Sequence, residues 1–272
     1  MRAAVLGKPI AHSLSPVLHL AAYRALGIAD EWTYEIVECD ERELPEVLDR
    51  GWAGLSLTMP LKRAVLPLLD RAEPLAVEVG GANTVVFRED GRYGYNTDVA
   101  GMIAALAGIG VVKADSATIL GAGATACAAL AAVRGLGLTE VMVLVRDRAR
   151  AGDLLAAARR LGMDVDLRPL TTQIRNGDLL ISTLPAGAAD FISERPLVSR
   201  SLPVAVLDVV YAPWPTRLAL AAERAGVPVA SGGDLLLHQA ARQVELMTGR
   251  SPAPVADMRA ALAARLPGPP GI

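Results

Sequence analysis

The stretch Ser116-Ala117-Thr118-Ile119-Leu120-Gly121-Ala122-Gly123-Ala124-Thr125-Ala126 lies near the middle of the 272-residue chain. It predicts a strand, a tight turn and the first turn of a helix, in the G-x-G-x-x-A pattern typical of dinucleotide-binding folds. Gly121 permits a turn that most residues cannot adopt, Gly123 lets the backbone approach a pyrophosphate, and Ala126 lets the helix lie close to the strand. The unpaired N–H groups at the helix start would point at the phosphates.

Composition excludes several classes of protein. Hydrophobic residues make up 52% of the chain, enough for a large core, and the net charge of −2 gives no electrostatic basis for binding nucleic acid or an anionic membrane. No apolar run reaches the roughly 18 residues of a membrane span, and residues 1–7 resemble a strand more than a signal peptide. Two isolated cysteines, Cys39 and Cys127, indicate a reducing compartment, so we expect a cytoplasmic protein.

Short apolar runs alternate with amphipathic stretches on both sides of the glycine-rich turn, as in βαβ units. The run 89–92 between two expected strands indicates a hairpin, so one antiparallel pair joins the first sheet. In the first third we expect strands at 3–6, 33–37, 53–57, 84–87 and 92–95 and helices at 16–26, 42–49 and 61–69. Further along we expect a helix at 98–107, then strands at 117–120, 141–145, 164–167, 179–182 and 204–208 alternating with helices, and a helical region from about 233 to 265.

This order predicts an α/β protein of two domains. Residues 1–99 form a mixed α/β substrate-binding catalytic domain, which the C-terminal helices at 234–266 complete. Residues 100–233 form a Rossmann-like, doubly wound dinucleotide-binding domain, and the Pro/Gly-rich tail at 267–272 is expected to be disordered. A cleft between two domains is a common location for a ligand site.

Four polar clusters interrupt the apolar pattern of the first domain. Ser13-Leu14-Ser15-Pro16 places two hydroxyls before a helix, where they cap the helix or bind a carboxylate. Thr58-Met59-Pro60-Leu61-Lys62 places a lysine in a first helical turn, which the helix dipole disfavours. Gly80-Gly81-Ala82-Asn83-Thr84 enters a strand and Gly94-Tyr95-Asn96-Thr97-Asp98 leaves one. For these two clusters, a simple turn and a helix cap are the alternatives to a functional site.

These clusters, in this order and followed by Gly-Ala-Gly-Ala, resemble the motifs of the shikimate dehydrogenase family. Two later runs, Asp208-Val209-Val210-Tyr211-Ala212-Pro213-Trp214-Pro215-Thr216 and Leu236-Leu237-His238-Gln239-Ala240, are similar to that family's late motifs. The resemblance spans about residues 5 to 250. It implies an enzyme that reversibly reduces 3-dehydroshikimate to shikimate with NADP, a step of chorismate and aromatic amino-acid biosynthesis.

The resemblance also implies roles for individual residues. Lys62 and Asp98 would form the catalytic pair. In substrate binding, the carboxylate would go to Ser13 and Ser15, and the ring hydroxyls to Thr58, Asn83 and Gln239, with Tyr211 nearby. In cofactor binding, the pyrophosphate would lie on Gly121, Ala122, Gly123, Ala124 and Thr125. The chain departs from the family in having Ser56 where asparagine is usual.

The residue types themselves support this chemistry. A ketone that receives a hydride develops negative charge on its oxygen, and a lysine ammonium within hydrogen-bonding reach stabilises that charge and can deliver a proton. Asp98 opposite Lys62 would keep the ammonium charged and oriented. Positioning and charge stabilisation are therefore the roles that we expect for Lys62, whether or not it carries the proton alone.

The cofactor preference depends on the residues after the strand at 141–145, which read Arg146-Asp147-Arg148-Ala149-Arg150. Guanidinium groups suit the 2′-phosphate of NADP, and the resemblance assigns that contact to Arg146 and Arg150. Asp147 leaves two alternatives open, because it either accepts the ribose hydroxyls of NAD or caps the next helix. We expect NADP, with NAD as the less favoured cofactor.

Other functions remain to be distinguished. One alternative is an NAD-dependent quinate/shikimate dehydrogenase, and another is a non-catalytic nucleotide-binding sensor, which would need neither Lys62 nor Asp98. The expected partners are small molecules, and the sequence leaves open whether the chain forms a homodimer. His12, His19 and His238 are too scattered for a metal-ligand cluster, so we expect no metal.

Overall fold

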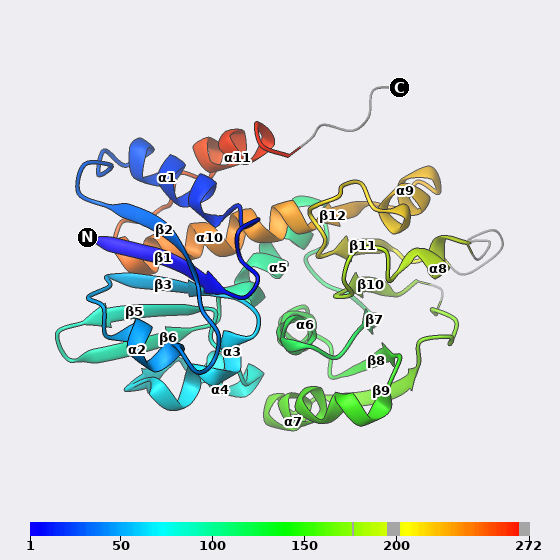
Figure 1. The fold of residues 1–272 in the computed structure, drawn as a ribbon. Coiled ribbons are helices and arrows are strands. Elements are labelled where there is room, and N and C mark those ends of the chain that lie inside the picture. Colours follow the sequence, from blue (N-terminus) through cyan, green and yellow to red (C-terminus); the bar gives the residue numbers. More distant parts are fainter. Residues whose placement is uncertain (176, 195–201, 267–272) are drawn as a thin grey trace. The chain divides into compact units, whose positions relative to one another are not determined.

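The computed structural model describes residues 1–175, 177–194 and 202–266. The chain divides into two compact units (Figure 1). Unit 1 comprises residues 1–101 and 236–265, and unit 2 is built on residues 102–235. The predicted boundaries at 99/100 and 233/234 each lie two residues before those of the units, and the predicted C-terminal limit at 266 lies one residue after Arg265. The tail that was expected to be disordered, 267–272, lies outside the described residues.

Unit 1 contains a mixed six-stranded sheet in the order β2-β1-β3-β5-β6-β4. Strand β1 pairs in parallel with β2 and β3, and β5 pairs antiparallel with β3 and β6. The predicted hairpin is present, because Arg88 pairs with Gly91 across a two-residue turn and Gly91 has a φ of 135° that favours glycine. The strands are β1 (Arg2–Gly7), β2 (Thr33–Glu38), β3 (Gly54–Leu57), β4 (Arg71–Ala72), β5 (Thr84–Arg88) and β6 (Gly91–Tyr95).

Helices of unit 1 come from both ends of the chain, and α1 packs against α11 (Figure 1). The single helix predicted at 61–69 is wrong. It ends at Ala64, and a 3-10 turn at Leu66–Leu68 follows, because Pro67 has no N–H and its ring disfavours a continuing α-helix. The helices are α1 (Ser15–Ala25), α2 (Leu44–Leu48), α3 (Leu61–Ala64), α4 (Pro74–Val79), α10 (Gly232–Thr248, from Leu236 onward in this unit) and α11 (Val255–Ala263).

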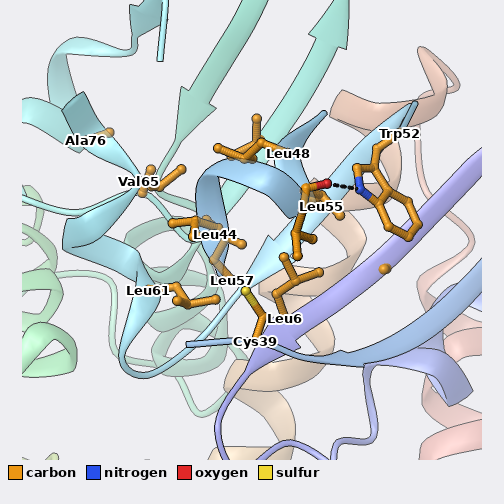
Figure 2. Packing of buried hydrophobic residues seen from close by; sticks show 14 residues of the cluster. Leu6, Cys39, Leu44, Leu48, Trp52, Leu55, Leu57, Leu61, Val65 and Ala76 are labelled. Atoms are coloured by element: carbon orange, nitrogen blue, oxygen red, sulfur yellow. Dashed lines mark hydrogen bonds between the residues drawn. The ribbon is translucent and has the colours of Figure 1, made fainter. Parts of the chain in front are cut away.

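A hydrophobic cluster packs α2 against β3, as Figure 2 shows. Leu44 and Leu48 of α2 and Leu55 of β3 are almost entirely buried, and burial of each such side chain stabilises the fold by about 1.5–3 kcal/mol. The Trp52 indole is buried beside them and donates a 2.7 Å hydrogen bond from Nε1 to the carbonyl oxygen of Val47. This packing covers the face of β3 that carries Leu55 and Leu57, so the residues that follow the strand begin from a fixed position.

Unit 2 contains a parallel six-stranded sheet in the order β12-β11-β10-β7-β8-β9. From β7 the chain adds β8 and β9 on one side and then β10, β11 and β12 on the other, which is the predicted doubly wound arrangement. Strand β12 was not predicted, because three residues are too few for a recognisable alternating pattern. The strands are β7 (Ala117–Leu120), β8 (Glu140–Val145), β9 (Asp164–Pro169), β10 (Leu179–Ser182), β11 (Ala205–Asp208) and β12 (Val229–Ser231). The helices are α5 (Thr97–Gly108, from Met102 onward in this unit), α6 (Ala124–Gly135), α7 (Gly152–Leu161), α8 (Asp190–Glu194) and α9 (Arg217–Arg224).

Candidate active site

Lys62 and Asp98 form an ion pair inside unit 1. The Lys62 Nζ lies 2.5 Å from the Asp98 Oδ2, although the two residues are 36 positions apart in the sequence. Their side chains are only 13% and 10% exposed, so solvent screens the pair much less than a surface ion pair. Lys62 lies in α3 after the end of β3, and Asp98 lies in the first turn of α5 after the end of β6. The fold therefore brings together the two residues that the sequence analysis selected as the catalytic pair.

Two glycines let the backbone approach Lys62 closely. Gly80 ends α4 in the left-handed conformation, with a φ of 79°. After it, a Cβ on Gly81 would lie 3.3 Å from the carbonyl oxygen of Lys62, and the N–H of Ala82 donates to that oxygen at 2.8 Å. The turn that leads into β5 thus fixes the main chain of Lys62.

Asn96, not Asp98, caps α5. The Asn96 Oδ1 accepts a 3.2 Å hydrogen bond from the backbone N–H of Asp98, and its Nδ2 donates to the carbonyl oxygen of Gly81 at 2.8 Å. The capping alternative for Asp98 is therefore wrong, and its carboxylate remains available to Lys62 and Asn83.

The Asn83 side chain, 2% exposed, orients the Asp98 carboxylate. Its Oδ1 accepts from the backbone N–H of Thr97 at 2.8 Å. Because a backbone N–H can only donate, the oxygen end of the amide must face Thr97, and the NH₂ end must face the other way. That end donates to the Asp98 Oδ1 at 2.8 Å and to the Gln239 Oε1 at 3.2 Å. Asn83 and Gln239 thus join the ion pair in one cluster.

The other predicted substrate residues of unit 1 lie outside this cluster. Thr58 follows β3 and is half-buried, with its N–H donating to Leu6 and its carbonyl accepting from Leu61. Ser13 Oγ accepts from the N–H of Ser15 at 3.3 Å. Ser15 itself is the first residue of α1 and does not cap it, so the capping alternative is also wrong for this serine.

Gln243 also contacts Asn83, although it was not predicted from the sequence. This residue lies four positions after Gln239 on α10, on the same helix face, and that spacing was the only available signal. Its Nε2 donates to the carbonyl oxygen of Asn83 at 3.2 Å, and its Oε1 accepts from the hydroxyl of Ser56 at 2.8 Å. The imidazole of His19, fully buried in α1, reaches the same Oε1 at 3.2 Å.

We expect His19 to make folding stability depend on pH. Burial lowers the pKa of His19 from 6.5 to about 3, although its hydrogen bond with Gln243 works in the opposite direction. Between these two values the unfolded chain binds a proton that the folded chain does not, so stability is lost as the pH falls through this range. At about 1.4 kcal/mol per pH unit, His19 should lower the free energy of unfolding by about 2 kcal/mol between pH 7 and pH 5.

Urea unfolding at the two pH values measures this effect. The matched control is His19→Gln, which retains an N–H donor for Gln243 and cannot titrate. Its free energy of unfolding should fall less than that of the wild type over the same interval. An equal fall in both proteins would contradict the assignment.

In unit 2, the glycine-rich turn follows β7, at the point where the strand order reverses. Gly121 has a φ of 104°, and a Cβ there would lie 2.6 Å from the Thr183 Oγ1, so the turn requires glycine. A Cβ on Gly123 would meet no atom within 4 Å, which leaves the backbone open to a ligand. Helix α6 begins at Ala124, as predicted, and Ala122 and Thr125 are half-buried beside the turn. The chemistry of this turn fits a pyrophosphate at a helix N-terminus.

The arginines after β8 are exposed. Within the described part of the chain, Arg146 and Arg150 take part in no ion pair, so their guanidinium groups are available to a phosphate. The Oδ1 of Asp147 accepts from the N–H of Ala149 at 2.9 Å and caps the short 3-10 helix at Arg148–Ala151. Of the two alternatives for Asp147, the structure therefore supports capping.

Tyr211 lies in unit 2, three residues after the end of β11. Asp208 holds this loop, because its carboxylate accepts from the Thr216 Oγ1 at 2.8 Å and from the N–H of Val210 at 3.3 Å. Burial raises the pKa of the Tyr211 phenol above its ordinary value. Among the residues that the structure describes, no group of three His, Cys, Asp or Glu side chains could hold a metal, and no helix is long and apolar enough to cross a membrane.

Known proteins resemble this chain over most of its length. The model of the shikimate dehydrogenase substrate binding domain matches residues 5–85, and that of the shikimate 5′-dehydrogenase C-terminal domain matches residues 234–263. The shikimate dehydrogenase (NADP(+)) of Geobacter metallireducens is 36% identical over 274 residues, which cover 96% of this chain and 95% of that protein.

Solved structures have a similar fold. The shikimate dehydrogenase of Mycobacterium tuberculosis has a TM-score of 0.84 and 42% identity, over 97% of this chain and 99% of that chain. A Thermus thermophilus shikimate 5-dehydrogenase, solved in complex with NADP(H) and shikimate, has a TM-score of 0.83 and 33% identity. That match covers 98% of this chain and all of the other.

Proposed function

Because the chain belongs to the shikimate dehydrogenase family, we propose that it reversibly reduces 3-dehydroshikimate to shikimate with NADP, in the biosynthesis of chorismate and aromatic amino acids. The observation that supports this most strongly is the buried pair of Lys62 and Asp98, with the Asn83 amide on the second carboxylate oxygen. A nucleotide-binding sensor would need no such pair.

Lys62 acts on the oxygen of the reacting carbonyl. Its ammonium group donates a hydrogen bond to that oxygen and stabilises the negative charge that develops during reduction. Asp98 holds the ammonium in a fixed direction, and Asn83 holds Asp98. The proton that the oxygen needs comes from Lys62 or from a water that Lys62 orients. In the reverse direction, the same groups remove the proton from the hydroxyl.

Polar side chains around the pair bind the substrate. We assign the ring hydroxyls to Thr58, Asn83 and Gln239, and we propose that Tyr211 also contributes to substrate binding. The substrate carboxylate is assigned to Ser13 and Ser15. Asn83 and Gln239 already share a hydrogen bond, so a substrate hydroxyl would enter an existing network of fixed donors and acceptors.

Unit 2 holds the cofactor in this proposal, and unit 1 binds the substrate. The bound nicotinamide supplies the hydride. Backbone N–H groups of the turn at 121–125 and the start of α6 bind the pyrophosphate. Arg146 and Arg150 bind the 2′-phosphate that distinguishes NADP from NAD, because a guanidinium matches the geometry and charge of a phosphate.

Absorbance at the reduced-nicotinamide band tests the proposal. Shikimate and quinate are each supplied with NADP⁺ and with NAD⁺, and we expect the fastest increase for shikimate with NADP⁺. Faster turnover of quinate with NAD⁺ would favour the quinate/shikimate dehydrogenase instead. Cofactor binding without turnover of either acid would contradict the proposed function and leave the non-catalytic sensor.

The same assay tests the phosphate contact. We expect Arg146→Ala to lower kcat/KM for NADP⁺ by about 10- to 100-fold, the size of a lost charge-assisted hydrogen bond, and to change kcat/KM for NAD⁺ much less. Arg148→Ala, an exposed arginine in the same turn, serves as the control. A wild type that prefers NAD⁺ would show the arginine assignment to be wrong.

The proposed partners are small molecules, namely the hydroxy acid or its ketone and the nicotinamide cofactor. A cytoplasmic location stays a prediction, and whether the chain forms a homodimer stays open. Cell fractionation and light scattering of the purified protein would check them.

A further inference from the structure

A group of buried polar side chains lies behind the candidate active site, and the mechanism above does not use it. Gln243, Ser56, Tyr34 and His19 are between 0% and 7% exposed. The Tyr34 phenol reaches the Ser56 Oγ at 2.6 Å, and that hydroxyl reaches the Gln243 Oε1 at 2.8 Å. Buried polar groups destabilise a fold unless each finds a partner, so a fully connected network indicates a requirement beyond packing.

A backbone carbonyl determines the direction of every hydrogen bond in this network. The Gln243 Nε2 lies 3.2 Å from the carbonyl oxygen of Asn83, which can only accept, so this end of the amide must be the NH₂. The other end is then the oxygen, and Ser56 and His19 must both donate to it. Since the single proton of Ser56 goes to Gln243, the Ser56 hydroxyl accepts from Tyr34.

The NH₂ group of Gln243 acts on Asn83 by two routes. One route is the bond to the Asn83 carbonyl oxygen. The second is a 3.0 Å hydrogen bond to the Thr84 Oγ1, whose own proton points to the Asn83 Oδ1 at 2.9 Å. Asn83 in turn donates to the carboxylate that pairs with Lys62. Gln243 therefore holds both the main chain and the side chain of the residue that orients Asp98.

We propose that Gln243 is a positioning residue of the reaction, acting through Thr84 and Asn83 on Asp98 and Lys62. The Ser56 hydroxyl donates its one proton to the Gln243 Oε1, so it holds Gln243 in place and has no proton left to donate to the substrate. This accounts for a serine where the family usually has asparagine. The proposal rests on the proposed function, since it assigns a purpose to the orientation of Asp98.

Loss of Gln243 should affect the chemical step more than substrate binding. Without its NH₂ group, the Thr84 hydroxyl is free to rotate and the Asn83 Oδ1 loses one of its donors. The Thr97 N–H still sets which way the Asn83 amide faces, but the amide is held by fewer hydrogen bonds and positions the Asp98 carboxylate less precisely. Gln243 contacts Asn83 directly, whereas it reaches Ser15 only through Ser56 and Tyr34. The effect should therefore fall mainly on kcat.

Gln243→Met tests the proposal, because methionine has nearly the same length and no hydrogen-bonding amide. We expect kcat for shikimate oxidation to fall about tenfold while KM changes less than about threefold. With shikimate deuterated at the carbon that loses the hydride, the isotope effect on kcat should increase, since hydride transfer becomes more limiting. The matched control is Val244→Ala, the next buried residue of α10, which creates a cavity and lowers Tm without touching the network.

A structural role alone would give Gln243→Met the same kcat and isotope effect as Val244→Ala, and that result would overturn the proposal. If Gln243→Met does not fold, Ser56→Ala and Thr84→Val carry the test, each with a smaller fall in kcat and a smaller rise in the isotope effect. If Gln243→Met folds, the double variant Gln243→Met/Thr84→Val should have nearly the same kcat as Gln243→Met. Both substitutions break the same connection, which runs from Gln243 through the Thr84 hydroxyl to the Asn83 side chain. These outcomes differ from a failure of the proposed function, because in that case the wild-type protein itself would not oxidise shikimate.

Discussion

Replacing Lys62 with alanine is expected to lower kcat for shikimate oxidation by about 10²- to 10⁴-fold, the usual loss when a positioned acid–base group is removed. The ammonium group stabilises charge that exists mainly in the transition state, so KM for shikimate should change less than kcat. Steady-state kinetics with saturating NADP⁺ measure both constants.

The control for Lys62→Ala is Arg63→Ala, the next residue of α3, whose side chain is exposed. It should have nearly wild-type kcat. Thermal unfolding of both variants separates a loss of catalysis from a loss of fold. A Lys62→Ala enzyme that retains more than about a tenth of the wild-type kcat would refute the role of Lys62, since the lower bound for such a group is about 10²-fold.

Replacing Asp98 with asparagine should lower both activity and stability. The new amide keeps an oxygen for Asn83 and therefore turns its NH₂ group toward the Lys62 ammonium, placing donor against donor. An unpaired charge in a buried pair costs about 3–5 kcal/mol, and the 10–13% exposure of this pair places the expected loss toward the lower end. We expect kcat to fall about 10²-fold, because the ammonium loses its orientation.

A double variant separates the two losses. Lys62→Met/Asp98→Asn removes the unpaired cation, so its free energy of unfolding, measured in urea, should recover most of the loss seen in Asp98→Asn. Its kcat should stay at or below that of Lys62→Ala. Recovery of activity along with stability would mean that the pair is structural only.

Local rules predicted much of this molecule. A few neighbouring residues determine glycine conformation and short-range hydrogen bonds. These local features explain the turn at Gly121, the start of α6 at Ala124 and the hairpin turn before Gly91. The errors were also local. Pro67 divided a helix that apolar periodicity had suggested, and β12 was too short to show a pattern.

The roles of single polar residues were harder to predict. From sequence alone, Ser15 and Asp98 were as well explained by helix caps as by a site, because both precede or begin helices. The structure decided this for Asp98 by supplying a different cap, the Asn96 side chain. Neighbouring residues in the sequence identify the candidates for a helix cap. Which of two candidates caps the helix depends on which side chain is held by a partner elsewhere in the fold.

Residue order and type alone were enough to indicate the family, the α/β architecture and the residues of the proposed catalytic pair, because motifs and turns are short-range features. Folding added the network behind that pair. Gln243 lies 160 positions from Asn83, and only the return of α10 to the first sheet places its amide against that carbonyl. Which way each amide faces then depends on backbone donors and acceptors from distant segments, and no pattern along the chain encodes that choice.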